Sequence, residues 1–226
     1  MGIIDLTGTI HTGMWSYDPP YPNFKLEPIP QPDWVEDKVY MENFKGMCGQ
    51  TGTYLETPAH LLGYRESYPL IDVGIEKLIN IRTYVIKLEL DDLPESGGKR
   101  AIPGDKLVEN VDQDLLESCD AVLVSTGWGK NWESADFLKA CPFFKHDAMD
   151  FLIESKLFLL GSDSPMWENV ENPEGFFPKF FNADILMLAP CVNLEMIREE
   201  VVALTVLPMK VEEACVVPCR AVAIES

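Results

Sequence analysis

The chain has 226 residues, 46% of them hydrophobic and 24% charged, which is typical of a globular protein with a substantial core. Its 37 acidic and 18 basic residues give a net charge of −19, and this charge argues against binding to nucleic acid or to anionic membranes. No apolar run reaches the roughly 18 residues that a transmembrane helix needs. The N-terminus lacks the pattern of a signal peptide, so we expect a cytoplasmic protein with six reduced cysteines.

The first part of the chain combines short predicted strands with a proline-rich segment. Residues 3–6 form an apolar strand, and six prolines within 17–33 predict an extended arm over about residues 15–34. We expect the aromatic side chains of this arm to pack either on the protein's own core or on a neighbouring subunit. Strands are predicted at 39–44 and 83–90, a short amphipathic turn or helix at 73–79, and a helix over 102–111.

The second part alternates buried strands with helices. Apolar runs at 121–125, 157–160 and 185–188 are typical of strands that are buried on both faces. Helices are predicted at 146–155 and 176–182, and two strands at 201–209 and 215–224 close the chain. This order predicts an α/β fold with a mixed sheet. No linker or repeat interrupts it, so we expect a single domain over residues 1–226.

The segment from Gln50 to His60 is the strongest candidate for a functional loop. Glu56 and His60 lie four residues apart with Pro58 between them, so we expect non-helical backbone across this interval. A carboxylate near an imidazole can support general acid–base catalysis, because the carboxylate orients the ring and stabilises its charged form. The alternative is a hydrogen-bonded histidine with a purely structural role. The predicted strand exits at 125–127 and 161–164 fall where open sheets bind ligands, although glycine turns end many strands.

This segment resembles the signature of the cyclase family, which includes bacterial kynurenine formamidases and related metal-dependent hydrolases. The family signature is His-x-Gly-Thr-His-x-Asp-x-Pro-x-His, and Gly52, Thr53, Pro58 and His60 match it. Further segments resemble those of the family in residue type and occur in the same order, at 5–14, 124–128, 160–164, 193–194 and 218–223. The resemblance implies a swivelling β/β/α domain with a mixed sheet and flanking helices. It also implies assembly into homodimers or homotetramers.

The ligands of the family's divalent metal are largely replaced in this sequence. By resemblance, the signature's first two histidines and its aspartate correspond to Gln50, Tyr54 and Glu56. A later histidine and glutamate complete the family's site, and Phe177 and Ala189 are the best candidates for their replacements. Because zinc sites use three or four N, S or carboxylate ligands, we expect no tightly bound metal. Weak binding of zinc or manganese at Glu56 and His60, or a site built from other ligands, remains the alternative.

The resemblance implies a hydrolase-like enzyme acting on a small aromatic or cyclic amide, lactone or ester, with arylformamidase-type hydrolysis as the family default. In this interpretation His60, the family's proton shuttle, is the general acid and base, and Glu56 orients it. We expect substrate-binding roles for Gln50, Tyr54, Trp15, Trp128 and Asp163, with Gln50 or Tyr54 donating hydrogen bonds to an oxyanion. Cys191 is either a nucleophile or a buried thiol. The rival hypothesis is a catalytically silent protein that binds a small molecule.

Overall fold

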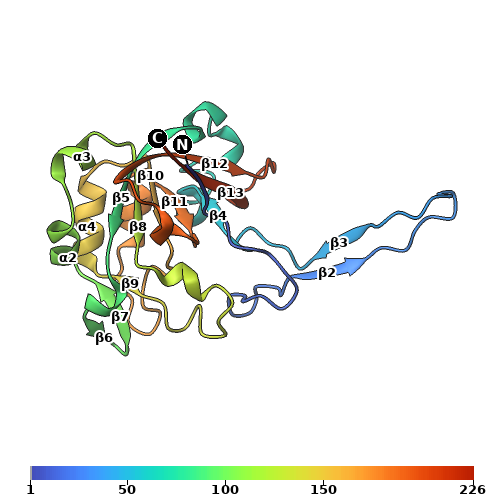
Figure 1. Ribbon diagram of the computed structural model, residues 1–226, viewed down its shortest axis with the longest axis horizontal. Coiled ribbons are helices and arrows are strands. Elements are labelled where there is room, and N and C mark those ends of the chain that lie inside the picture. Colours follow the sequence, from blue (N-terminus) through green and yellow to red (C-terminus); the bar gives the residue numbers. More distant parts are fainter. Residues whose placement is uncertain (1) are drawn as a thin grey trace.

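An eight-stranded mixed sheet forms the body of the protein in the computed structural model, which describes residues 2–226 (Figure 1). The strand order is β1-β13-β12-β5-β8-β10-β11-β4. Strand β4 (Tyr54–Glu56) pairs with β11 on one side and with β13 (Val216–Glu225) on the other, so the sheet closes on itself like a barrel. The predicted α/β fold with a mixed sheet is confirmed.

Parallel strands form the middle of this sheet. They are β5 (Ile81–Lys87), β8 (Ala121–Ser125), β10 (Leu159–Ser162) and β11 (Leu186–Ala189). Strands β8, β10 and β11 are buried at every residue, which explains why the sequence shows them as continuous apolar runs. The antiparallel strands β1 (Gly2–Asp5), β12 (Val201–Pro208) and β13 complete the sheet together with β4.

The two faces of the sheet bury separate apolar cores. Along β8, Ala121 and Leu123 face the core enclosed by the strands, while Val122 and Val124 face the core beneath the helices. The covering helices are α2 (Gly104–Glu109), α3 (Gln113–Glu117), α4 (His146–Glu154) and α5 (Phe177–Asn182). Helices α2, α4 and α5 lie within the predicted ranges, whereas α3 was not predicted.

Several short elements connect these layers. A small sheet contains β6 (Glu95–Ser96), β7 (Lys99–Ile102) and β9 (Phe143–Phe144). Single 3₁₀ turns occur at Leu70–Asp72, Ile75–Leu78, Leu90–Asp92, Trp128–Asn131 and Leu194–Met196. No helix within residues 2–226 is long and apolar enough to cross a lipid bilayer.

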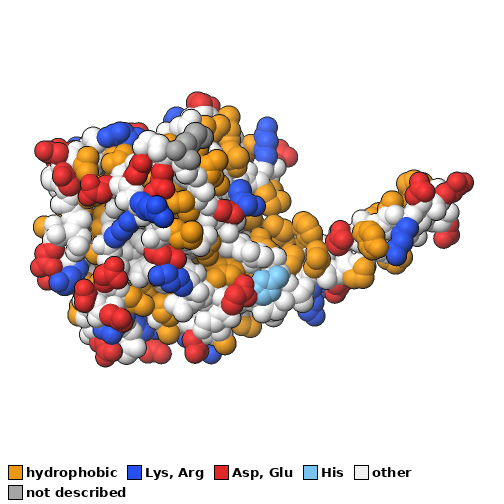
Figure 2. Space-filling view, in the orientation of Figure 1, with side chains coloured by type: hydrophobic (Ala, Val, Ile, Leu, Met, Phe, Trp, Pro, Cys, Tyr) orange, Lys and Arg blue, Asp and Glu red, His pale blue; other side chains and the backbone are white. Residues whose placement is uncertain are grey.

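A two-stranded ribbon projects far from the body (Figure 1). Its strands are β2 (Lys25–Pro28), inside the proline-rich segment, and β3 (Glu42–Lys45). The predicted strand at 39–44 therefore begins three residues later than expected. Trp34, between the two strands, is 82% exposed. Figure 2 shows apolar and acidic side chains side by side along this arm.

Candidate active site

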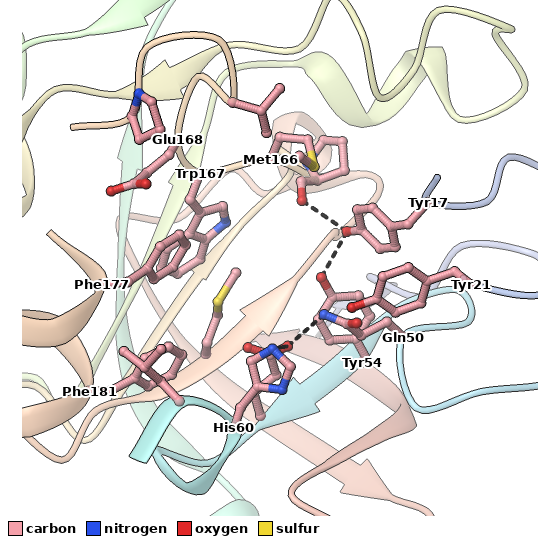
Figure 3. Close-up of a pocket in the computed structure, with 16 residues that line it drawn as sticks. Tyr17, Tyr21, Gln50, Tyr54, His60, Met166, Trp167, Glu168, Phe177 and Phe181 are labelled. Carbon is pink, nitrogen blue, oxygen red and sulfur yellow. Dashed lines mark hydrogen bonds and ion pairs between the residues drawn. The ribbon is translucent and has the colours of Figure 1, made fainter. Parts of the chain in front are cut away.

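A pocket of about 470 Å³ opens between the base of the arm, strand β4 and the segment that leads from β10 into α5 (Figure 3). Its walls are mainly apolar and rich in aromatic rings, and they also carry Gln50, Glu56, His60 and Glu168. The aromatic residues are Tyr17, Tyr21, Tyr54, Trp167, Phe177 and Phe181. Such an apolar cavity with a few convergent polar groups is the usual form of a small-molecule site.

The residues that match the family signature hold this wall in place. Gly52 has a φ of +76°, and a Cβ at this position would lie 2.7 Å from Ile10 Cγ1, so the turn requires glycine. The Thr53 hydroxyl donates to the Pro190 carbonyl oxygen at 2.7 Å and accepts from the Gly8 amide at 3.0 Å. The segment therefore enters β4 in a fixed orientation.

Glu56, at the end of β4, is a buried carboxyl group that has few hydrogen bonds to replace its lost hydration. Its side chain is 2% exposed, and its Oε1 accepts one hydrogen bond, of 3.0 Å, from Gln50 Nε2. Burial raises the pKa of Glu56 to about 8, and the Gln50 hydrogen bond offsets this only in part. At neutral pH Glu56 is therefore mostly protonated and can donate a proton.

His60 lies across from this carboxyl group, on the short helix α1 (Ala59–Leu62). Its Nε2 is 3.9 Å from Glu56 Oε1, and its ring meets Phe181 edge-on at 6.4 Å between centroids. Partial burial lowers the pKa of His60 below its usual value, so the imidazole is neutral at pH 7 and can accept a proton. The expectation of non-helical backbone is wrong at Ala59 and His60, because Pro58 caps the start of α1, where its missing N–H is tolerated.

A chain of hydrogen bonds determines what Tyr54 can do. Tyr17 Oη donates to the Pro165 carbonyl oxygen at 2.9 Å, and this oxygen can only accept. In its 2.8 Å contact with Tyr54 Oη, Tyr17 must therefore act as the acceptor, so the Tyr54 proton is engaged there. Tyr54 lines the pocket, but in this arrangement it presents a lone pair and no hydrogen-bond donor for an oxyanion.

Three of the predicted substrate-binding residues lie outside the lining of this pocket. Trp15 and Trp128 pack in an aromatic cluster around Phe137. Asp163, fully buried, accepts hydrogen bonds from the Thr126 amide at 3.0 Å and the Thr126 hydroxyl at 2.8 Å. Burial raises its pKa to about 6. Asp163 thus ties the exits of β8 and β10 together.

The structure places the other predicted site residues in different surroundings. Gln50, Tyr54, Glu56, His60 and Phe177 all line the pocket, whereas Ala189 is buried in β11. Cys191 is fully buried, and burial raises the pKa of its thiol well above the usual value, so it is a poor nucleophile. The lining residues missed by the sequence analysis come mainly from segment 165–173, whose only sequence signal is its place after the β10 exit.

Comparisons with known proteins identify relatives. The family model described as "Putative cyclase" matches residues 4–169. Isatin hydrolase A from Labrenzia aggregata bound to benzyl benzoate has a TM-score of 0.77 and 19% identity, covering 98% of this chain and 93% of that one. Isatin hydrolase A from Ralstonia solanacearum has a TM-score of 0.76 and 22% identity, and the match covers 98% of this chain and 91% of that one. A predicted metal-dependent hydrolase from Bacillus stearothermophilus has a TM-score of 0.73 and 18% identity, covering 98% and 97%. No curated protein matches this sequence.

The residues at this site do not fit a divalent metal. Of the four side chains at the signature positions, Gln50 already directs its amide N–H to Glu56, and the Tyr54 hydroxyl proton is engaged with Tyr17. Residues 2–226 bring together no group of three or more His, Cys, Asp or Glu side chains that could hold a metal ion. One carboxyl group and one imidazole fall short of the three or four ligands that zinc sites use.

Proposed function

This chain belongs to the cyclase family, and on that premise we propose that it is a hydrolase acting on a small aromatic or cyclic amide, lactone or ester. The observation that carries the proposal is that His60 Nε2 and Glu56 Oε1 lie 3.9 Å apart in the wall of a pocket lined by aromatic residues. Burial there lowers the pKa of His60 and raises that of Glu56, which favours a neutral imidazole beside a protonated carboxyl group. The similar folds that are named for hydrolysis of isatin, a bicyclic aromatic ring amide, support this choice of substrate class.

The environment assigns different roles to the two titratable groups. Burial moves their pKa values in opposite directions, so that the histidine is the base and the carboxyl group is the acid near neutral pH. Glu56 therefore does more than orient His60, because it also carries a transferable proton. Such a pair can contribute roughly 10²- to 10⁴-fold to the rate for each proton transfer.

The reaction balances with water as the only co-reactant. His60 Nε2 takes a proton from the water molecule whose oxygen attacks the substrate carbonyl carbon. Glu56 gives its proton to the departing nitrogen or oxygen as the C–N or C–O bond breaks. Transfer of the proton from His60 back to Glu56, over the 3.9 Å between them or through one water, restores both groups.

One observation favours a second candidate function, that of a binding protein without catalysis. The hydroxyl proton of Tyr54 and one amide N–H of Gln50 are engaged within the wall, which leaves few side-chain donors for an oxyanion. Such a protein would bind the same aromatic ligands without converting them.

Hydrolysis assays with matched variants distinguish the two candidates. The substrates are isatin, dihydrocoumarin and phenyl acetate, which represent a ring amide, a lactone and an aryl ester. We expect turnover of at least one of them, and a fall in kcat of about 100-fold or more in His60→Ala. The control is His146→Ala, which alters an exposed histidine on α4. Equal activity of wild type and His60→Ala would refute the proposed role.

We also propose that the protein works in the cytoplasm, where its six cysteines stay reduced. All six are free in the structure. Fractionation of cells that express the protein tests this, and recovery from the membrane or the secreted fraction would contradict it.

A further inference from the structure

The segment between β10 and α5 and the start of α5 form one wall of the pocket, and the mechanism above uses none of their side chains. Trp167, Glu168 and Phe177 lie together there, across the cavity from Gln50 and Tyr21 (Figure 3). An indole, a phenyl ring and a carboxylate lie together here, and side chains of these kinds attract positively charged groups.

Glu168 is held in position without a cationic partner. Its Oε1 accepts a 2.9 Å hydrogen bond from the Phe176 amide at the start of α5, which fixes the side chain. The described part of the chain places no Lys, Arg or His nitrogen within 4.0 Å of this carboxylate. Its second oxygen is therefore available to a positively charged group on a ligand.

Trp167 carries a buried polar atom that the protein leaves unpaired. The residue is 1% exposed, and its Nε1–H has no hydrogen-bond partner among residues 2–226. Figure 3 shows this nitrogen on the side of the ring that faces the pocket. Leaving such a donor unsatisfied costs about 1–3 kcal/mol. This nitrogen is closed off from solvent and cannot pair with a cation, so Trp167 contributes to the pocket lining through its ring.

The charge of the whole pocket is one-sided. Its described lining includes the carboxyl groups of Glu56 and Glu168 but no lysine or arginine. A ligand carboxylate would therefore lose its hydration without gaining an opposite charge. An ammonium group would gain both a carboxylate and the electron-rich faces of aromatic rings.

We propose that the substrate of this pocket carries an ammonium group and no carboxylate, and that the ammonium group binds at Glu168 against Trp167 and Phe177. The inference rests on the proposed function in one respect, because it takes the same pocket as the substrate site. The aromatic ring and the reacting carbonyl then lie toward His60 and Glu56. The carboxylate that hydrolysis creates finds no cation in the pocket, which favours release of the product.

Binding of three small probes tests this charge preference without any chemical step. The probes are phenethylammonium, its neutral counterpart 2-phenylethanol and the anion 3-phenylpropionate, measured by isothermal titration calorimetry at pH 7. We expect the cation to bind at least about tenfold more tightly than the alcohol, and the anion to bind more weakly than the alcohol. Equal affinities, tighter binding of the anion, or no binding of any probe at millimolar concentration would overturn the proposal.

A matched pair of variants assigns the effect to one residue. Glu168→Gln keeps an oxygen that can accept from the Phe176 amide, so we expect it to fold, and it should bind the cation no better than the alcohol. Glu171→Gln makes the same change in net charge three residues away, outside the pocket lining, and should retain the preference. A preference that survives Glu168→Gln would contradict the assignment. Because the probes are not hydrolysed, this result is independent of whether His60 catalyses hydrolysis.

Discussion

At the scale of single residues, the buried carboxyl group of Glu56 is the most unusual feature of the protein. Its single hydrogen bond from Gln50 does not compensate for the loss of hydration, so the folded protein keeps it protonated at neutral pH. Burying an acid has a free-energy cost, and such a cost is consistent with a functional role, since pKa values are most strongly perturbed at functional sites.

This burial has a measurable effect on stability. The pKa of Glu56 rises from 4.5 to about 8 on folding, so the native state holds more protons than the unfolded state between these pH values. The contribution of Glu56 to stability is therefore present below pH 4.5 and is lost as the pH rises toward 8, by roughly 3 kcal/mol at pH 7. Glu56→Gln cannot titrate at this position and does not suffer this loss. As the pH rises from 4.5 to 8, the unfolding free energy of the variant should therefore increase relative to that of the wild type.

Urea denaturation at these two pH values checks the prediction. Glu171→Gln, which changes an exposed carboxylate, is the control and should show almost no such gain. A difference between Glu56→Gln and wild type that stays constant with pH would mean that Glu56 is ionised in the folded protein.

At the scale of elements, a hydrogen-bonded chain joins three segments that are distant in sequence. Tyr17 at the base of the arm connects Tyr54 on β4 with the Pro165 carbonyl after β10. These segments form one side of the pocket, so the hydroxyl of Tyr17 positions the wall that carries Glu56.

Tyr17 takes part in both of these hydrogen bonds and Tyr54 in only one, which predicts unequal effects of two similar substitutions. Tyr17→Phe leaves both the Pro165 carbonyl and the Tyr54 hydroxyl without a partner, and we expect it to destabilise the protein by about 1–3 kcal/mol. Tyr54→Phe leaves the bond from Tyr17 to Pro165 intact and should cost less, about 1 kcal/mol. Thermal denaturation compares the two variants. A larger loss in Tyr54→Phe would contradict the central position of Tyr17 in this chain of hydrogen bonds.

The main elements could be predicted from sequence because their burial leaves a pattern. Strands β8, β10 and β11 appear as apolar runs, and Gly52, Thr53 and Pro58 locate the wall of the pocket. Helix α3 was missed because five residues give too little periodicity.

The remainder of the site depends on tertiary structure. Trp167 and Glu168 reach the pocket only because the sheet brings the β10 exit close to β4, and no motif surrounds them. Trp15 and Trp128 lie in a separate cluster around Phe137. Packing of Trp15 on the protein's own core was one of the two alternatives for the arm's aromatic side chains, and the sequence could not decide between them because the outcome depends on how the base of the arm packs.

At the scale of the whole molecule, the projecting arm is the feature least suited to an isolated monomer. A two-stranded ribbon is marginally stable alone in water, and this one exposes large aromatic side chains. Trp34 is 82% exposed, Tyr40 78% and Phe44 61%. We therefore propose a homo-oligomer, a dimer or a tetramer, in which the arm of one copy packs on another.

Replacing the arm's three exposed aromatic residues tests this assembly. The variant Trp34→Ser/Tyr40→Ser/Phe44→Ser should reduce the mass measured by light scattering to that of a monomer. Val108→Ser, which alters an exposed apolar residue on α2, is the control and should leave the mass unchanged. A wild-type protein that is already monomeric at micromolar concentration would contradict the proposal.

We propose that His60 and Glu56 perform hydrolysis as a base and acid pair without a divalent metal. The most direct test of this claim is the pH dependence of kcat/KM in the presence of EDTA, for whichever of the three assay substrates is hydrolysed. Because Glu56 must be protonated, kcat/KM should fall above about pH 8. Because His60 must be neutral, kcat/KM should also fall in acid, with a midpoint below pH 6.5. Loss of all activity in EDTA, with recovery on addition of zinc or manganese, would contradict the claim.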